Sequence, residues 1–246
     1  MPGPADGRAP PAYHRGVETN TGAIVRLGWA RALGLSDDAL DAGEGRPVVR
    51  VPARDRVMVL RLWDRHVLVG PDWFQQRTQG VHPRQLEDGP VLLRCCEGHG
   101  ARLVGQTVLA FTDRYVELDG LEDVPVADEP AAVAALERAC PPDDVTEVGL
   151  AGLGRVFVTL DDRDQPTAGA GYAERQGILG HLAVLTPPEQ RRAGHGTVAA
   201  ALALNDALDA GLVPQWGARA DNVAARRMSR RLGLVEVGVQ TTVALT

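Results

Sequence analysis

The hydrophobic and polar positions of the last hundred residues follow a regular order of strands and helices. "GRVFVTLDD" and "QPTAGAGYAE" are apolar runs on either side of the acidic turn "DDRD", which predicts a β-hairpin, and "GILGHLAVLT" is a third run of strand length. The alanine-rich segment 195–210 predicts a helix that ends at Gly211. After the predicted strand "LVPQWGARA", segment 221–233 predicts a second helix with an Asp221 or Asn222 N-cap. "LVEVGVQTTVAL" supplies the final strands.

The earlier part of the chain predicts a short helix over 21–35 and then several strands. "RPVVRVPARDRVMVLRLWDRHVLVGPDW" alternates hydrophobic and charged residues and is broken by a Gly-Pro pair, which is typical of strands. "GPVLLRCC" and "RLVGQTVLAFTDRYVEL" continue the strand pattern on either side of the turn "EGHG". "DEPAAVAALERAC" predicts a helix with an acidic start that ends at two prolines.

The order strand–strand–strand–helix–strand–helix–strand predicts an α/β fold of the α+β type. We expect a mixed, mostly antiparallel sheet flanked by helices, preceded by a β-rich N-terminal region. The proline- and glycine-rich residues 1–20 are expected to be a disordered tail. The β-rich region is then assigned to 21–120 and the helix-flanked domain to 121–246.

Composition excludes several classes of protein. The chain has 246 residues, of which 44% are hydrophobic, so it can bury a core. It has no apolar run of membrane-spanning length, and its N-terminus lacks the apolar centre of a signal peptide. The three cysteines give neither a disulfide framework nor a zinc-binding spacing. We therefore expect a cytoplasmic protein with no membrane partner and no metal.

The charge of the chain is acidic and its cations are of one kind. The formal net charge of −6 argues against general binding to nucleic acid. All 26 basic residues are arginine, and the absence of lysine excludes Schiff-base chemistry and a Walker A phosphate loop.

The segment "LTPPEQRRAGHGTVAAALALNDAL" joins a predicted strand to a predicted helix through two glycines. A helix that begins at such a pair presents unpaired N–H groups and partial positive charge, which favour phosphate. A tight connection with solvated arginines is the alternative. Gly194-x-Gly196-x-x-Ala199 also matches the dinucleotide fingerprint, with Asp221 further on. Against that match, "PPEQRR" separates the strand from the first glycine, and the residues that follow are too few for a doubly wound sheet.

Two motifs resemble the GNAT superfamily of acyl-CoA N-acyltransferases. Arg191-x-x-Gly194-x-Gly196 resembles the motif [Q/R]-x-x-G-x-[G/A] that follows a strand in that superfamily. "WGARADNVAARRMSRRLGL" resembles its next segment, a strand followed by an asparagine and an alanine-rich helix. The resemblance extends from Gly177 to about Val239, and it implies a GNAT-like sheet in this part of the chain. Region 21–120 is expected either to bind the acceptor or to be a diverged copy of the same fold.

The resemblance also implies a site for acyl-CoA, with acetyl-CoA as the expected donor. The implied contacts are Val184, Leu185 and Thr186 along the pantetheine arm, Arg191, Arg192, Ala193, Gly194, His195, Gly196 and Thr197 at the pyrophosphate, and Asn222 near the pantetheine. Either Arg226 with Arg230 or Arg227 with Arg231 would reach the 3′-phosphate, unless these arginines form a solvated face.

The catalytic residues are less clearly marked. His181 on the third strand is either a general base or a histidine packed in the sheet with its ring paired to a neighbour, and Glu174 and Tyr172 are alternative bases. Many members of the superfamily carry a tyrosine as general acid, and Ser229 occupies that position here. Because a serine is a poor acid, the acid step is left to solvent or to a water molecule that relays a proton from Ser229.

These features predict an N-acetyltransferase that acts on the primary amine of a small molecule by direct attack on the thioester. The alternative is a non-catalytic GNAT-like module that binds CoA or mediates an interaction, which the missing tyrosine favours. A homodimer is left open by the sequence. Trp63, Trp73, Phe74 and Tyr115 are assigned to an acceptor pocket or a dimer surface, with buried core as the default.

Overall fold

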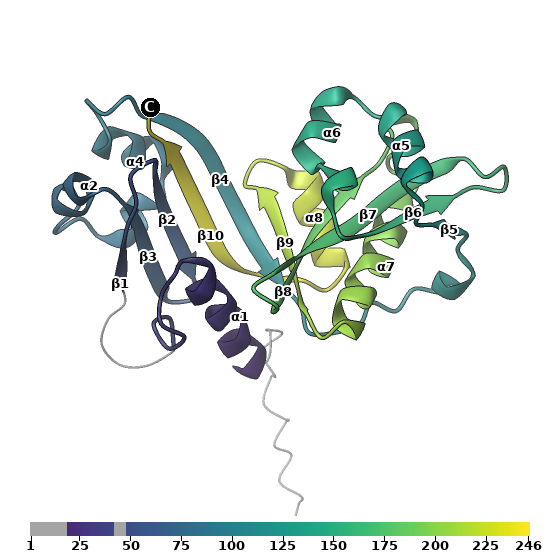
Figure 1. Cartoon of the computed structure of the whole chain (residues 1–246), viewed down its shortest axis with the longest axis horizontal. Helices are drawn as coiled ribbons and strands as arrows, with labels where there is room; N and C mark the ends of the chain where they lie inside the picture. Colours follow the sequence, from purple (N-terminus) through teal and green to yellow (C-terminus); the bar gives the residue numbers. More distant parts are fainter. Residues whose placement is uncertain (1–18, 42–47) are drawn as a thin grey trace, which may run out of the picture.

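The computed structural model describes residues 19–41 and 48–246 (Figure 1). The strands are β1 (Val48–Pro52), β2 (Arg56–Leu62), β3 (Arg65–Gly70), β4 (Arg102–Phe111), β5 (Val126–Ala127), β6 (Arg155–Leu160), β7 (Pro166–Arg175), β8 (Leu179–Leu185), β9 (Val213–Arg219) and β10 (Val235–Ala244). The helices are α1 (Thr19–Ala32), α2 (Asp72–Arg77), α3 (Pro83–Leu86), α4 (Gly89–Cys95), α5 (Pro130–Arg138), α6 (Pro142–Val148), α7 (His195–Asp209) and α8 (Val223–Arg231). Residues 1–18 of the predicted tail lie outside the described part of the chain.

The strands form one sheet with the order β1-β3-β2-β10-β4-β9-β8-β7-β6-β5. Two neighbouring pairs, β1 with β3 and β8 with β9, are parallel, and the other pairs are antiparallel. The prediction of a mixed, mostly antiparallel sheet flanked by helices is confirmed. The parallel pair β8–β9 needs a crossover, which α7 provides.

The strand prediction for "GPVLLRCC" is wrong, because this segment forms α4. The side chain of Asp88 caps the helix by accepting a hydrogen bond from the N–H of Val91 at 2.9 Å. Pro90 in the first turn lacks an N–H that would be unpaired there in any case. Leu92 and Cys96, four residues apart, are buried on one side of the helix. The run is apolar because one helix face packs against the sheet.

Strands from the early and the late parts of the chain interleave at the centre of the sheet. β10, at the C-terminal end of the chain, lies between β2 and β4, and β4 in turn lies between β10 and β9 (Figure 1). β4 precedes residue 120 in the sequence, whereas β9 and β10 follow it. The sheet is therefore continuous across the predicted boundary between 21–120 and 121–246.

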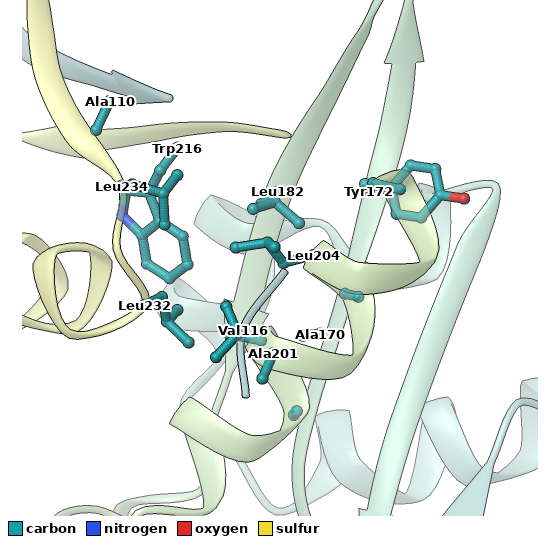
Figure 2. Close-up of a cluster of buried hydrophobic side chains, with 14 of the residues drawn as sticks. Ala110, Val116, Ala170, Tyr172, Leu182, Ala201, Leu204, Trp216, Leu232 and Leu234 are labelled. Atoms are coloured by element: carbon teal, nitrogen blue, oxygen red, sulfur yellow. The ribbon is translucent and has the colours of Figure 1, made fainter. Parts of the chain in front are cut away.

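The two faces of the central strands are covered by different helices. Leu182 of β8 and Trp216 of β9 lie on the α7 side of the sheet, where Leu182 faces Leu204 and Trp216 lies beside Leu234 (Figure 2). Their neighbours along the strands, including Leu179 and Val213, point the other way and pack with Trp29 of α1. Helix α6 also contacts β8. This alternation separates the α7 side of the sheet from the α1 side.

Candidate functional site

The parallel strands β8 and β9 separate near the middle of the sheet. They pair from Leu179 opposite Val213 as far as Leu182 opposite Trp216. Beyond that point β8 pairs with β7 alone, and β9 pairs with β4 alone. The result is an opening between two neighbouring strands that continue in the same direction.

The backbone of Val184 faces this opening. The C=O of Ile178 accepts a hydrogen bond from the N–H of Val213 on β9 at 2.8 Å. Because backbone groups alternate sides along a strand, the even-numbered residues of β8 direct their N–H and C=O groups toward β9. Val184 is the first such residue beyond the paired segment. Its N–H and C=O are available to a ligand that enters between the strands.

The connection from β8 to α7 forms a close-packed glycine loop. Gly194 is the N-cap of α7 with a φ of +97°, in the region that favours glycine. A Cβ at Gly196 would lie 2.7 Å from the Oγ1 atom of Thr186 and 3.2 Å from the Cε atom of Met228. The first N–H groups of the helix, such as that of His195, have no acceptor within the helix. Glycine at 196 thus lets the start of α7 approach the end of β8.

The arginines near the loop differ in what they contact. The guanidinium of Arg191 donates hydrogen bonds to the C=O of Thr186 at 3.0 Å and to the carboxylate of Asp144 at 2.6 Å. Arg192 is exposed and has no partner within residues 19–41 and 48–246. Arg226 makes two hydrogen bonds to Glu236, at 2.9 and 2.8 Å. Arg192 is therefore better placed than Arg191 to meet a phosphate.

Asn222 and Ser229, which were predicted to be site residues, make hydrogen bonds to the backbone of α8. The Oδ1 atom of Asn222 accepts a hydrogen bond from the N–H of Ala225 at 3.0 Å, which makes Asn222 the N-cap. Ser229 is 1% exposed, and its hydroxyl donates to the C=O of Arg226 at 3.0 Å. This geometry does not favour Ser229 as a general acid, because its proton is committed to the helix backbone.

Tyr172 does not reach the opening either. Its hydroxyl points away from the neighbouring hydrophobic cluster (Figure 2) and donates to Asp206 at 2.6 Å. Burial, together with this hydrogen bond, raises the pKa of Tyr172 to about 12. Glu174 lies on the same face of β7 as Tyr172, two residues further on, and is exposed.

A half-open cavity of about 300 Å³ lies on the α1 side of the sheet, where β8 and β9 begin to separate. Its lining comes from α1, α6 and five strands and includes Trp29, Glu147, Arg175, His181, Gln215 and Gly217. The face alternation places the cavity opposite α7 and α8. The opening therefore has the glycine loop on one side of the sheet and this cavity on the other.

A chain of hydrogen bonds orients His181 in the cavity wall. Nε1–H of Trp29 donates to the Oε1 atom of Gln215 at 3.0 Å, and the Nε2 atom of Gln215 lies 3.0 Å from the Nδ1 atom of His181. Gln215 is 1% exposed. Burial lowers the pKa of His181 to about 4, and the positive charge of Arg175 acts in the same direction. His181 is therefore a neutral imidazole near pH 7.

Glu147 and Arg175 bring charge to the cavity, although no sequence signal marked them. Glu147 is near the end of α6, and its carboxylate has no hydrogen-bond partner among the residues that the structure describes. Arg175 ends β7 and likewise has no partner in the described part of the chain. Desolvation lowers the pKa of Arg175. The cavity wall thus combines the exposed carboxylate of Glu147, whose charge also acts on the guanidinium of Arg219, with the exposed guanidinium of Arg175 and a neutral imidazole.

The four N-terminal aromatic residues lie elsewhere. Trp63 stacks on Phe111 and Trp73 on His99, while Phe74 is fully buried. Tyr115 is exposed, and its hydroxyl donates to Asp209 at 2.8 Å. None of the four lines the cavity, and the aromatic residue that does so is Trp29.

Neither a membrane-spanning helix nor a metal site is present among residues 19–41 and 48–246. No helix there combines the length and apolar character needed to cross a membrane. No group of three or more histidine, cysteine or acidic side chains is arranged there to hold a metal ion.

Comparison with known proteins gives similarities of fold. No protein-family model matches the chain, and no curated protein matches it. Among solved structures, it is similar to a GCN5-related N-acetyltransferase from Kribbella flavida, with 23% identity and a TM-score of 0.46 over 63% of this chain and 64% of that protein. It is also similar to an acetyltransferase of the GNAT family from Colwellia psychrerythraea, with 13% identity and a TM-score of 0.47 over 63% of this chain and 61% of that protein.

A third similar structure is a GCN5-related N-acetyltransferase-like protein from Streptococcus suis, with 20% identity and a TM-score of 0.44. The match covers 63% of this chain and 66% of that protein, so the chain spans less than two thirds of the length of each of these three proteins. The names of these three proteins place them in, or liken them to, the superfamily that the two sequence motifs resemble.

Proposed function

We propose that the protein transfers an acyl group, with acetyl-CoA as the expected donor, to a primary amine of a small molecule. The observation that carries this proposal is the opening between β8 and β9. It connects a loop suited to phosphate on the α7 side with a cavity suited to a small acceptor on the α1 side. A thioester held in the opening would be accessible to an amine from the cavity.

The fit of the donor is supported by the glycine loop and the free strand edge. Glycine at 196 lets the start of α7 pack against the end of β8, and the first backbone N–H groups of α7, which have no acceptor within the helix, would bind a pyrophosphate. Arg192 adds a positive charge beside them. The unpaired N–H and C=O of Val184 would hydrogen-bond the extended pantetheine arm or the thioester itself.

In the proposed reaction, the amine nitrogen forms a bond to the thioester carbonyl carbon while the carbon–sulfur bond breaks. The N–H of Val184 would stabilise the negative charge that develops on the carbonyl oxygen. Glu147 would accept the proton that the amine loses. Because Ser229 is buried, we assign the proton that the departing thiolate gains to solvent.

Glu147 replaces His181 as the proposed general base for a chemical reason. The Nδ1 atom of His181 already lies at hydrogen-bond distance from the amide nitrogen of Gln215. The low pKa of His181, about 4, makes it a weak base at neutral pH. Glu147 has no such partner within the described residues.

The proposal is tested with Gly194→Glu, which would place a carboxylate at the helix N-terminus, where a phosphate is expected. Gly211→Glu is the matched control, because Gly211 has a similar φ of +76° and open space around it but lies at the other end of α7. We expect calorimetry to detect acetyl-CoA binding to the wild type and to Gly211→Glu, with a loss of at least about tenfold in Gly194→Glu. Thiol release in the presence of amines should follow the same order.

Three other results would contradict the proposal in different ways. Equal binding by the two glutamate variants would show that the loop does not hold the donor. Binding of NAD in place of acetyl-CoA would favour the dinucleotide interpretation. Binding of acetyl-CoA without thiol release from any amine would favour the non-catalytic module.

A further inference from the structure

The cavity beside the opening contains a hydrogen-bond donor whose direction is fixed by its neighbours. An indole N–H can only donate, so Trp29 requires the oxygen of the Gln215 amide and turns the amide nitrogen toward His181. The amide nitrogen can only donate, so the Nδ1 atom of His181 must accept. The proton of the neutral imidazole is then on Nε2.

The Nε2–H group of His181 faces the cavity. It has no hydrogen-bond partner among the described residues, and its nitrogen atom is not fully enclosed by the protein. Since His181 lines the cavity, this N–H is exposed to whatever the cavity holds. It acts as a fixed donor, and a ligand there must present an acceptor.

Arg175 adds a second donor group on the same face. Arg175 pairs with Leu179, and His181 is two residues further along β8, so the side chains of Arg175 and His181 lie on one face of the sheet. The two are close enough for the guanidinium charge to act on the imidazole. Arg219, which also lines the cavity, is paired with Asp221 at 3.2 Å. Arg175 is thus a guanidinium whose charge is not matched by a carboxylate of the described chain.

Resting on the proposed function, we infer that the acceptor is a primary amine that also carries a carboxylate, as an amino acid does. Arg175 and the Nε2–H of His181 would bind the two carboxylate oxygens, and Glu147 would face the amine. Charges in a binding site complement those of the ligand, so a dipolar molecule fits a wall that bears both signs. A polyamine would meet the unpaired charge of Arg175. The volume of about 300 Å³ is near the lower end for small-molecule sites and suits a compact acceptor.

The experiment measures acetyl-CoA-dependent thiol release for matched acceptors. Each pair consists of an amino acid and the amine that lacks its carboxylate, such as leucine with isopentylamine and phenylalanine with phenethylamine, and β-alanine and 4-aminobutyrate extend the panel. We expect kcat/KM to be about 10- to 100-fold higher for the member with a carboxylate, which is the range of a charge-assisted hydrogen bond. Calorimetric binding of the same compounds to the protein with CoA gives a second readout that does not need turnover.

Variants of Arg175 assign the preference to this cavity. Arg175→Gln should reduce the preference for the carboxylate to less than about threefold, mainly through KM, and Arg175→Lys should retain part of it. Arg102→Gln is the matched control, since Arg102 is an exposed arginine at the far end of β4 from the cavity-lining Thr107. Its preference should equal that of the wild type.

The outcomes separate the inference from the proposed function. If acetyl-CoA binds and amines without a carboxylate react or bind as well as their partners, the inference is wrong and the proposed function stands. Binding of acetyl-CoA with no binding or turnover of any carboxylate-bearing amine also overturns the inference. If acetyl-CoA itself does not bind, the proposed function fails first.

Discussion

The behaviour of His181 is determined by residues that are distant from it in the sequence. Trp29 lies on α1 and Gln215 on β9, and together they fix which imidazole nitrogen carries the proton. The sequence placed His181 on a strand near the cofactor motif, and the structure puts it in the cavity wall. A pattern in the sequence could not reveal its tautomer or its desolvation, because both depend on side chains brought together by the fold. Glu147 and Arg175 likewise belong to no sequence motif, because only the fold brings them to the same cavity as His181.

The burial of His181 predicts how the stability of the protein depends on pH. The pKa of His181 is lowered from 6.5 to about 4 in the folded protein, so between these values the unfolded chain binds a proton that the folded protein does not. The free energy of unfolding should therefore be lost as the pH falls from about 6.5 to about 4, by at most about 3 kcal/mol from this residue. Above pH 6.5 His181 should make no pH-dependent contribution.

This prediction is checked by urea unfolding at pH 7.5 and pH 4.5 for the wild type and His181→Gln, which keeps a hydrogen-bond acceptor for Gln215. The variant should lose less stability than the wild type on acidification. His82→Asn is the control, because His82 is exposed at a helix N-cap that asparagine also provides. An identical pH dependence of the wild type and His181→Gln would contradict the assigned burial.

Replacing each of the two candidate carboxylates by glutamine is expected to affect kcat differently. Glu147 lines the cavity, whereas Glu174 is exposed on the other face of the sheet. Glu147→Gln should lower kcat by about 10²- to 10⁴-fold, the usual range for loss of a general base, with acetyl-CoA affinity unchanged. Glu174→Gln should retain kcat within about twofold. A larger loss in Glu174→Gln than in Glu147→Gln, measured by thiol release, would reverse the assignment.

At the scale of elements, local patterns predicted the C-terminal strands and helices well and failed at α4. The hairpin β6–β7 and helices α7 and α8 each have turn or cap residues that mark their ends. The segment "GPVLLRCC" is apolar at most positions and has neither a period of two nor a period of 3.6. Its pattern therefore does not distinguish a buried helix from a strand. The separation of β8 from β9 has no local pattern that marks it, because which residues pair is set by tertiary structure.

That separation predicts a specific effect of proline at Val184. The N–H of Val184 faces the opening and is not part of the pairing with β7, so Val184→Pro removes this N–H without breaking a hydrogen bond between strands. We expect kcat to fall by about 10²- to 10³-fold, as when one donor to a developing oxyanion is removed. Thermal unfolding should show that the variant still folds and is stabilised by acetyl-CoA.

Val184→Ala is the control for this substitution, because alanine keeps the N–H but shortens the side chain that packs near Gly196. Its kcat should stay within about threefold of the wild type. Equal losses in the proline and alanine variants would mean that packing, and not the N–H, is what the reaction needs.

At the scale of the whole molecule, the interleaved sheet makes the two sequence regions depend on each other. The cavity takes Trp29, Thr107 and Leu109 from before residue 120 and the rest of its lining from after it. One hydrophobic cluster likewise contains Val25 and Leu60 together with Leu179. The sequence pattern changes near residue 120, but strand pairing and a hydrophobic cluster join the two regions.

This arrangement predicts that residues 121–246 do not fold stably alone. In isolation, β10 would lose both of its neighbours, β2 and β4, and β9 would lose β4, which leaves unpaired backbone and exposed apolar side chains. Fragments 1–120 and 121–246 should each lack a cooperative urea transition by circular dichroism, while the full chain shows one. Co-expression of the two fragments should restore both the transition and acetyl-CoA binding, since the break falls in the connection after β4 and cuts no strand. If fragment 121–246 alone unfolded cooperatively and bound acetyl-CoA, the donor site would be an independent domain, and the N-terminal strands would serve only the acceptor side.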